Sequence, residues 1–190
     1  MFSWSLSEGR ERPRFDASQR RYAVRSDSSQ WIARIAEFDS GPFQIRAVLS
    51  VDDWVGQGGI VWGLRADQSA FPKKQYRCWA VMYYRTVPTD PAKLAVRELV
   101  LTQFSFDDVR ETWGRFVDVQ EITPPAGPGA VLQVTVEDDG LLIKFDERTR
   151  WRPVDQLNRT GWLPDGKTAF GITGRGGDVV LRDLSIRSLP

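Results

Sequence analysis

Histidine is missing altogether from this 190-residue chain, and cysteine occurs once, as Cys78. Without histidine there is no Ser–His–Asp triad, no Cys–His pair and no HExxH zinc motif. A single cysteine also excludes an intrachain disulfide and, in practice, a tetrahedral zinc site. Any catalysis must therefore use carboxylates, lysine, tyrosine, arginine or backbone groups. Cys78 lies in the apolar run QYRCWAVMYY and is expected to be a buried thiol.

An excess of charge of either sign is also missing, because 26 Lys and Arg residues face 25 Asp and Glu residues. This balance argues against a dedicated nucleic-acid binder and gives no reason to expect a membrane surface as partner. No apolar run has the length of a signal peptide or of a membrane span. The chain as written is expected to be cytoplasmic, or extracytoplasmic if it is cut from a longer protein.

What the chain does have is a series of short apolar runs with turn residues between them. Helix signals are scarce, at 105–108 and 153–158 only, and the predicted strands cover residues 31–38, 42–51, 58–66, 74–86, 93–104, 113–121, 130–147, 168–174 and 178–187. The run 74–86 is apolar on both faces and therefore predicts a central strand covered twice. We expect an all-β, antiparallel two-sheet sandwich of jelly-roll type over 21–190, preceded by a polar, arginine-rich arm at 1–20.

The clearest local prediction is the hairpin in 130–147. Leu132, Val134 and Val136 share one face of its first half. Asp139-Gly140 is expected to be a two-residue type I′ turn, because both central positions of that turn need a positive φ.

The segments RRYAVRSDSSQWIARIAEF, PFQIRAVLSV, GGIVWGLRA and KTAFGITGRGGDVVLRDLSIRSL together resemble the concanavalin A-like lectin/glucanase jelly roll. Within that superfamily the likeness is to laminin-G-like modules and to domains described as 3-keto-disaccharide hydrolase-like. The resemblance implies that the long last strand closes a sheet beside the N-terminal strand. It carries no catalytic residue over to this chain, and it supports the fold better than the function.

Carboxylates do not form a recognisable catalytic set. Glycosidases of this fold need two of them, usually from a Glu-x-Asp-x-Glu run on one strand, and no such run occurs. Glu98 and Glu121 stand alone, and the acidic residues at 137–139 are explained by a hairpin tip. No cofactor is expected, and calcium is only weakly supported, because Asp52-Asp53 and Asp138-Asp139 lack the spacing of calcium ligands.

Aromatic residues are the most informative positive signal, since eight tryptophans are well above ordinary usage. Trp31, Trp62 and Trp79 are expected in the core. The remaining candidates form a predicted ligand-binding set, with three tryptophans in loop-like contexts that either expose their rings or fill the core rim, and three residues on one expected strand face: Trp54, Trp151, Trp162, Tyr83, Arg85 and Arg97.

Three functions remain open at this level. The first is a non-catalytic, lectin-like module that binds carbohydrate through exposed aromatic side chains. The alternative is an intracellular protein–protein interaction or scaffold domain in a bacterium, and a glycoside hydrolase is disfavoured by the missing histidine and the missing carboxylate pair. The expected partner is a carbohydrate or a protein, with neither nucleic acid nor membrane involved.

Overall fold

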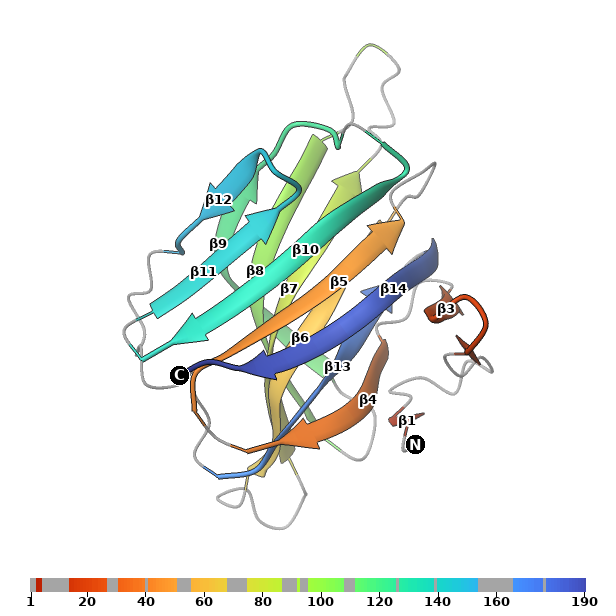
Figure 1. The fold of residues 1–190 in the computed structure, drawn as a ribbon. Coiled ribbons are helices and arrows are strands. Elements are labelled where there is room, and N and C mark those ends of the chain that lie inside the picture. Colours follow the sequence, from red (N-terminus) through yellow and green to blue (C-terminus); the bar gives the residue numbers. More distant parts are fainter. Residues whose placement is uncertain are drawn as a thin grey trace.

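The described part of the chain forms two antiparallel sheets of seven strands each, packed face to face and containing no helix (Figure 1). The computed structural model describes residues 3–4, 14–26, 31–39, 41–50, 56–67, 75–86, 92, 96–107, 112–125, 127–138, 140–153, 166–175 and 177–190. Sheet A contains, in spatial order, β1 (Ser3–Trp4), β4 (Trp31–Phe38), β13 (Thr168–Arg175), β6 (Gly56–Asp67), β7 (Gln75–Thr86), β8 (Val96–Asp107) and β9 (Thr112–Glu121). Sheet B contains β12 (Thr149–Trp151), β11 (Gly140–Phe145), β10 (Gly129–Glu137), β5 (Phe43–Ser50), β14 (Gly177–Ser188), β3 (Arg21–Ser26) and β2 (Arg14–Asp16).

The all-β sandwich predicted from the sequence is confirmed. The last strand, β14, lies inside sheet B between β5 and β3, so it pairs with an early strand of the chain as expected, although β3 is not the first strand. One expected helical turn is wrong: β8 continues through Asp107, so most of the segment 105–108 is strand.

The predicted hairpin forms between β10 and β11, but its turn is displaced by one residue. Glu137 pairs with Gly140, so Gly140 belongs to strand β11 and not to the turn, and Asp139 lies outside the described residues. The apolar pattern does not separate the two registers, because they differ by two positions and keep the same residues on the inner face.

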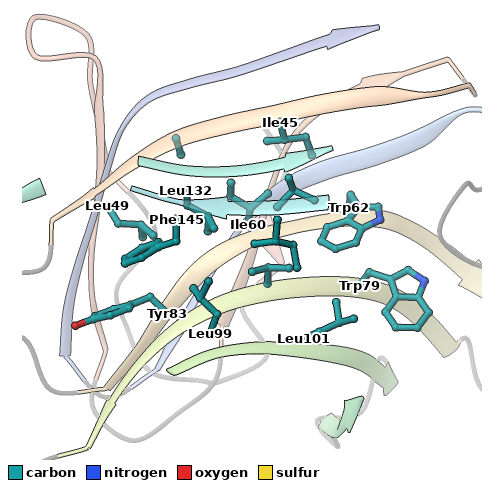
Figure 2. Packing of buried hydrophobic residues seen from close by; sticks show 14 of the residues in the cluster. Ile45, Leu49, Ile60, Trp62, Trp79, Tyr83, Leu99, Leu101, Leu132 and Phe145 are labelled. Carbon is teal, nitrogen blue, oxygen red and sulfur yellow. The ribbon is translucent and has the colours of Figure 1, made fainter. Parts of the chain in front are cut away.

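The core lies between the sheets and takes its residues from alternate positions of the strands (Figure 2). On β5, every second residue from Phe43 to Leu49 is at most 1% exposed. Trp62 and Trp79 lie opposite each other on β6 and β7, and both are buried as predicted. This shared apolar interior is the main force that holds the two sheets together.

The two sheets differ in their outer faces. On sheet A the outward residues Val61, Ala80, Met82 and Thr102 are at most 1% exposed, so β6, β7 and β8 are buried on both sides. The prediction of a central, twice-covered strand is thus confirmed for β7. On sheet B, β5 alternates strictly between buried and half-exposed residues. One face of sheet B is therefore open to solvent.

Cys78 lies on the buried outer side of sheet A. Its exposed fraction is 2%, and burial raises the pKa of its thiol. The prediction of a buried thiol is confirmed, and such a thiol is a poor nucleophile and metal ligand.

Two glycines allow the strands of sheet A to approach closely, and one of them lies next to a register shift. A Cβ on Gly59 would lie too near the carbonyl oxygen of Val81, and one on Gly171 would lie too near that of Ala33. The pairing of β13 with both neighbours shifts next to Gly171. Glycine is required at these positions because a side chain would collide with backbone atoms.

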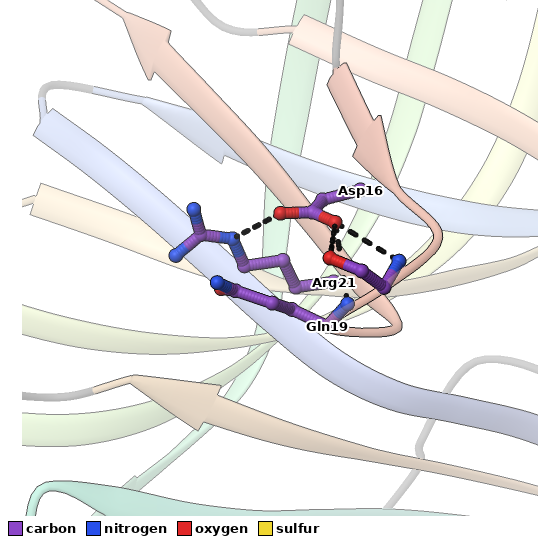
Figure 3. A network of polar contacts seen from close by, with 4 residues as sticks. Asp16, Gln19 and Arg21 are labelled. Atoms are coloured by element: carbon purple, nitrogen blue, oxygen red, sulfur yellow. Dashed lines mark hydrogen bonds and ion pairs between the residues drawn. The ribbon is translucent and has the colours of Figure 1, made fainter.

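Asp16 stabilises the β2–β3 edge of sheet B through hydrogen bonds and an ion pair (Figure 3). Its Oδ1 accepts hydrogen bonds from Ser18 N at 3.0 Å, Ser18 Oγ at 2.6 Å and Gln19 N at 3.2 Å. These bonds lower the pKa of Asp16, and its Oδ2 lies 3.6 Å from Arg21 Nε.

Parts of the predicted N-terminal arm are strands, since β1 pairs with β4 and β2 with β3. The division of the chain at residue 20 stays a prediction. None of the described segments forms a helix long and apolar enough to cross a membrane.

Candidate ligand-binding site

The structure divides the six residues of the predicted ligand-binding set into three groups. Trp54 and Trp162 lie outside the described residues, and their role stays a prediction. Trp151 forms the end of β12 and is 6% exposed, with its ring in the core. Of the two alternatives left open for Trp151, the structure shows a ring that fills the core rim, because TRW pairs as an edge strand with β11 and turns the indole inward.

Tyr83, Arg85 and Arg97 do lie together, as predicted from strand alternation. Arg85 and Arg97 are direct cross-strand partners on β7 and β8. Tyr83, however, is 1% exposed and stacks on Phe145 across the core, with ring centroids 5.3 Å apart (Figure 2). The prediction that Tyr83 belongs to the ligand-binding set is thus wrong, because its ring faces the opposite sheet. Ligand binding by the two half-buried arginines stays a prediction.

Electrostatics at this cluster reflect its position at the end of the core. Burial raises the pKa of Tyr83, and the nearby charges of Arg97 and Arg85, with a hydrogen bond from Arg97, oppose that rise. The two guanidinium groups therefore favour the ionised form of the Tyr83 phenol, whereas burial favours its neutral form.

A second set of polar residues crosses the outer face of sheet A at the same end. The pairing of neighbouring strands places one polar residue from each of five strands in a single line, which we call the polar row: Arg175, Gln57, Tyr84, Glu98 and Glu121. Direct partners on adjacent strands point their side chains to the same face of a sheet. Five strands at the usual spacing make the row about 19 Å long.

The polar row is accessible, unlike the middle of the outer face of sheet A, where Val61, Ala80, Met82 and Thr102 are buried. Arg175 and Glu121 are exposed, and the three residues between them are half-exposed. Two exposed apolar side chains lie on strands of this region, Val96 at 41% and Val119 at 46%. The row thus combines a phenol ring, two carboxylates, an amide and a guanidinium beside small apolar surfaces.

The sequence did not predict that Glu98 and Glu121 lie next to each other. Each was interpreted as an isolated carboxylate, yet they are direct partners on β8 and β9. Hairpin pairing of the two runs could have brought them near each other. A register shift between Leu101 and Thr102 makes the partner Glu121, whereas counting from the hairpin end would give Gln120.

Metal ligation finds no support in the described residues, where no group of three acidic or cysteine side chains gathers. Asp52, Asp53 and Asp139 lie outside the described residues, and Asp138 is exposed at the tip of a hairpin. Weakly supported calcium binding therefore stays a prediction.

Comparison with known proteins gives matches in structure only. No protein-family model matches the chain, and no curated protein does. A protein of unknown function with a galectin-like fold from Bacillus subtilis is 12% identical, with a TM-score of 0.64 and coverage of 93% of this chain and 86% of that one.

Two further solved structures are proteins whose names refer to carbohydrates. The carbohydrate-binding module CBM66 from Bacillus subtilis is 14% identical over 88% of this chain and 86% of its own, with a TM-score of 0.51. A GH16 protein of the mixed linkage glucan PUL of Bacteroides ovatus, solved with its product, is 10% identical over 90% and 86%, with a TM-score of 0.52. These likenesses show the fold alone: the chain shares the antiparallel two-sheet sandwich of these proteins, the fold that the sequence resemblance implied.

Proposed function

We propose that this protein is a non-catalytic carbohydrate-binding module, and that the polar row on the outer face of sheet A is its binding site. The observation that carries the proposal is the alignment of Arg175, Gln57, Tyr84, Glu98 and Glu121 on five adjacent strands. The fold is one that known carbohydrate-binding modules and glycoside hydrolases share.

The chemistry of the row suits a sugar chain. Carboxylates accept hydrogen bonds from hydroxyl groups, and amide and guanidinium groups donate them. The ring of Tyr84, at the centre of the row, offers an apolar face and a polar tip. Val96 and Val119, on the same strands as the two glutamates, add apolar contact area for the C–H faces of a sugar. A line about 19 Å long accommodates an oligosaccharide rather than a single sugar unit.

Trp54 is a further residue of this proposal. It precedes Gln57 of the polar row by three positions in the sequence. Its binding role remains the prediction made from the sequence.

The first test is binding to a panel of neutral oligosaccharides, followed by calorimetric titration with the best ligand. Tyr84→Leu is expected to weaken binding at least about tenfold, because a central aromatic residue dominates an interface of this kind. The matched control is Tyr76→Leu, which changes a half-buried tyrosine on the same strand and the same face, about 26 Å away along β7.

The affinities of the two variants can be compared directly if both keep the wild-type midpoint of thermal unfolding. Loss in Tyr84→Leu with retention in Tyr76→Leu supports the site. Equal affinity in both variants would mean that the polar row is not the site, and a panel without any ligand would refute carbohydrate binding itself. In that last case the interaction-domain alternative becomes the one to pursue, by pull-down with the intact protein.

A glycoside hydrolase is the second candidate, and one observation favours it. Glu98 and Glu121 are direct cross-strand partners on one face, and retaining glycosidases hold two carboxyl groups about 5 Å apart. The test is release of reducing ends from the bound oligosaccharide. Activity that disappears in both Glu98→Gln and Glu121→Gln, and persists in Glu147→Gln in an exposed turn, would replace the binding module with an enzyme.

A further inference from the structure

The solvent-facing side of sheet B carries cations that the fold does not explain. They occupy outward positions on β5, β11, β12 and β14, and we call them the basic face: Arg46, Lys144, Arg150, Arg182 and Arg187. All are exposed except Arg46, which is half-exposed. The whole chain is nearly neutral, so this grouping is a local property of one surface.

Among the residues whose side chains the structure describes, counter-charges are scarce on this surface. The described acidic side chains on the five strands from β12 to β14 are Glu137 and Asp183. Oε2 of Glu137 lies 3.4 Å from Nη1 of Arg152, and Oδ1 of Asp183 lies 3.6 Å from Nε of Arg20. Both carboxylates therefore pair with arginines outside the basic face. None of its five cations forms an ion pair with a carboxylate in the described part of the chain.

Some of the cations are also direct cross-strand neighbours. Lys144 is the partner of Arg150 on β12, and Arg182 is the partner of Arg21 on β3. Like charges in this relation destabilise a sheet. Arg182 extends across β5, with its guanidinium 3.8 Å from the point where a Cβ on Gly129 of β10 would lie. Folding stability gives no reason for such an arrangement, whereas binding of an anion does.

Neutral hydrogen-bonding groups lie between the cations. Gln133 occupies the position between Lys144 and Arg46 in one cross-strand line, which continues to Ser185. In a neighbouring line, Gln44 Nε2 donates to Thr135 Oγ1 at 3.1 Å. No aromatic residue is present at the described outward positions of these strands, so these positions offer no ring on which a nucleic-acid base could stack.

We infer that the basic face binds an acidic polysaccharide, a chain that carries carboxylate or sulfate groups among its hydroxyl groups. Arginine binds planar oxyanions with two parallel hydrogen bonds, and amide and hydroxyl side chains bind sugar hydroxyls. The face spans five strands, about 19 Å, which matches an extended polymer rather than a single ion. The inference does not depend on the polar row, which lies on the opposite sheet.

The test is titration of the full chain with dextran sulfate, polygalacturonate, unmodified dextran and single-stranded DNA at two salt concentrations. Dextran sulfate, polygalacturonate or both are expected to bind, with an affinity that falls as salt rises. Lys144→Glu and Arg187→Glu are each expected to weaken that binding by about tenfold, because each reverses a charge at the interface. Lys167→Glu changes the net charge equally, in the turn before β13, and is expected to leave the affinity within about twofold.

The outcomes also distinguish this inference from the proposed function. Tyr84→Leu should leave binding of the acidic polymers unchanged. Equal losses in Lys144→Glu and Lys167→Glu would show that net charge alone is responsible and would overturn the inference. It would equally be overturned if DNA bound more tightly than either acidic polysaccharide, or if neither acidic polysaccharide bound, and the latter result would leave the polar row untouched.

Discussion

Sheet A and sheet B share one core but use their outer faces differently. The middle strands of sheet A come from continuous apolar runs such as RCWAVMYY, and both of their faces are buried at the centre of the sheet. The strands of sheet B come from alternating runs such as FQIRAVLS, and their outer face carries the cations. The comparison teaches that the period of the apolar pattern decides which sheet surface remains available for binding.

The largest expected difference in stability comes from placing the same charge on the outer face of each sheet. Val61→Asp in β6 of sheet A buries an unpaired carboxylate and should lower the free energy of unfolding by more than about 3 kcal/mol. Val131 in β10 of sheet B is half-exposed, so Val131→Asp should lower the free energy of unfolding by about 1 kcal/mol or less. Urea unfolding of both variants measures the difference, and equal losses would contradict the contrast between the sheets.

The inner faces, by contrast, should respond alike. Leu99 of sheet A and Leu132 of sheet B are both 0% exposed in the shared core. Leu99→Ala and Leu132→Ala should each cost about 2–5 kcal/mol, because each leaves a cavity. Denaturant unfolding should show one transition for both variants, and two separate transitions would mean that the sheets do not share a core.

A smaller effect is expected from pH. Burial raises the pKa of Tyr83 in sheet A and of Tyr22 in sheet B above the usual value of 10.0. The neutral phenols thus contribute stability below pH 10 that is lost as the pH rises through their folded-state values. Tyr83→Phe and Tyr22→Phe should each flatten the fall in stability at alkaline pH, as thermal melts at several pH values would reveal. An unchanged slope in both variants would contradict the assigned cause.

The smallest expected signal concerns Cys78 on the covered side of sheet A. A thiol-specific reagent should modify it only as fast as the protein opens, because the thiol is 2% exposed and its pKa is raised. Rapid stoichiometric labelling of the native protein would show that this face is open in solution. Labelling in denaturant gives the reference rate.

Most of the architecture could be predicted from the sequence, because strand length, alternation and turn residues are local properties. The polar row could not, since Arg175 and Gln57 come from strands far apart in the chain that meet only through the topology. Glu98 and Glu121 face each other because of a register shift inside β8, which no apolar pattern records. The sequence left the burial of Trp151 open for a related reason: its three-residue edge strand is too short to show a period.

The most direct test of the central claim is to map backbone amide shifts by NMR during titration with a neutral oligosaccharide selected from the panel. The account predicts that the shifts concentrate at Gln57, Tyr84, Glu98 and Glu121 on the outer face of sheet A. Shifts confined to the outer face of sheet B, around Arg46 and Gln133, would contradict it.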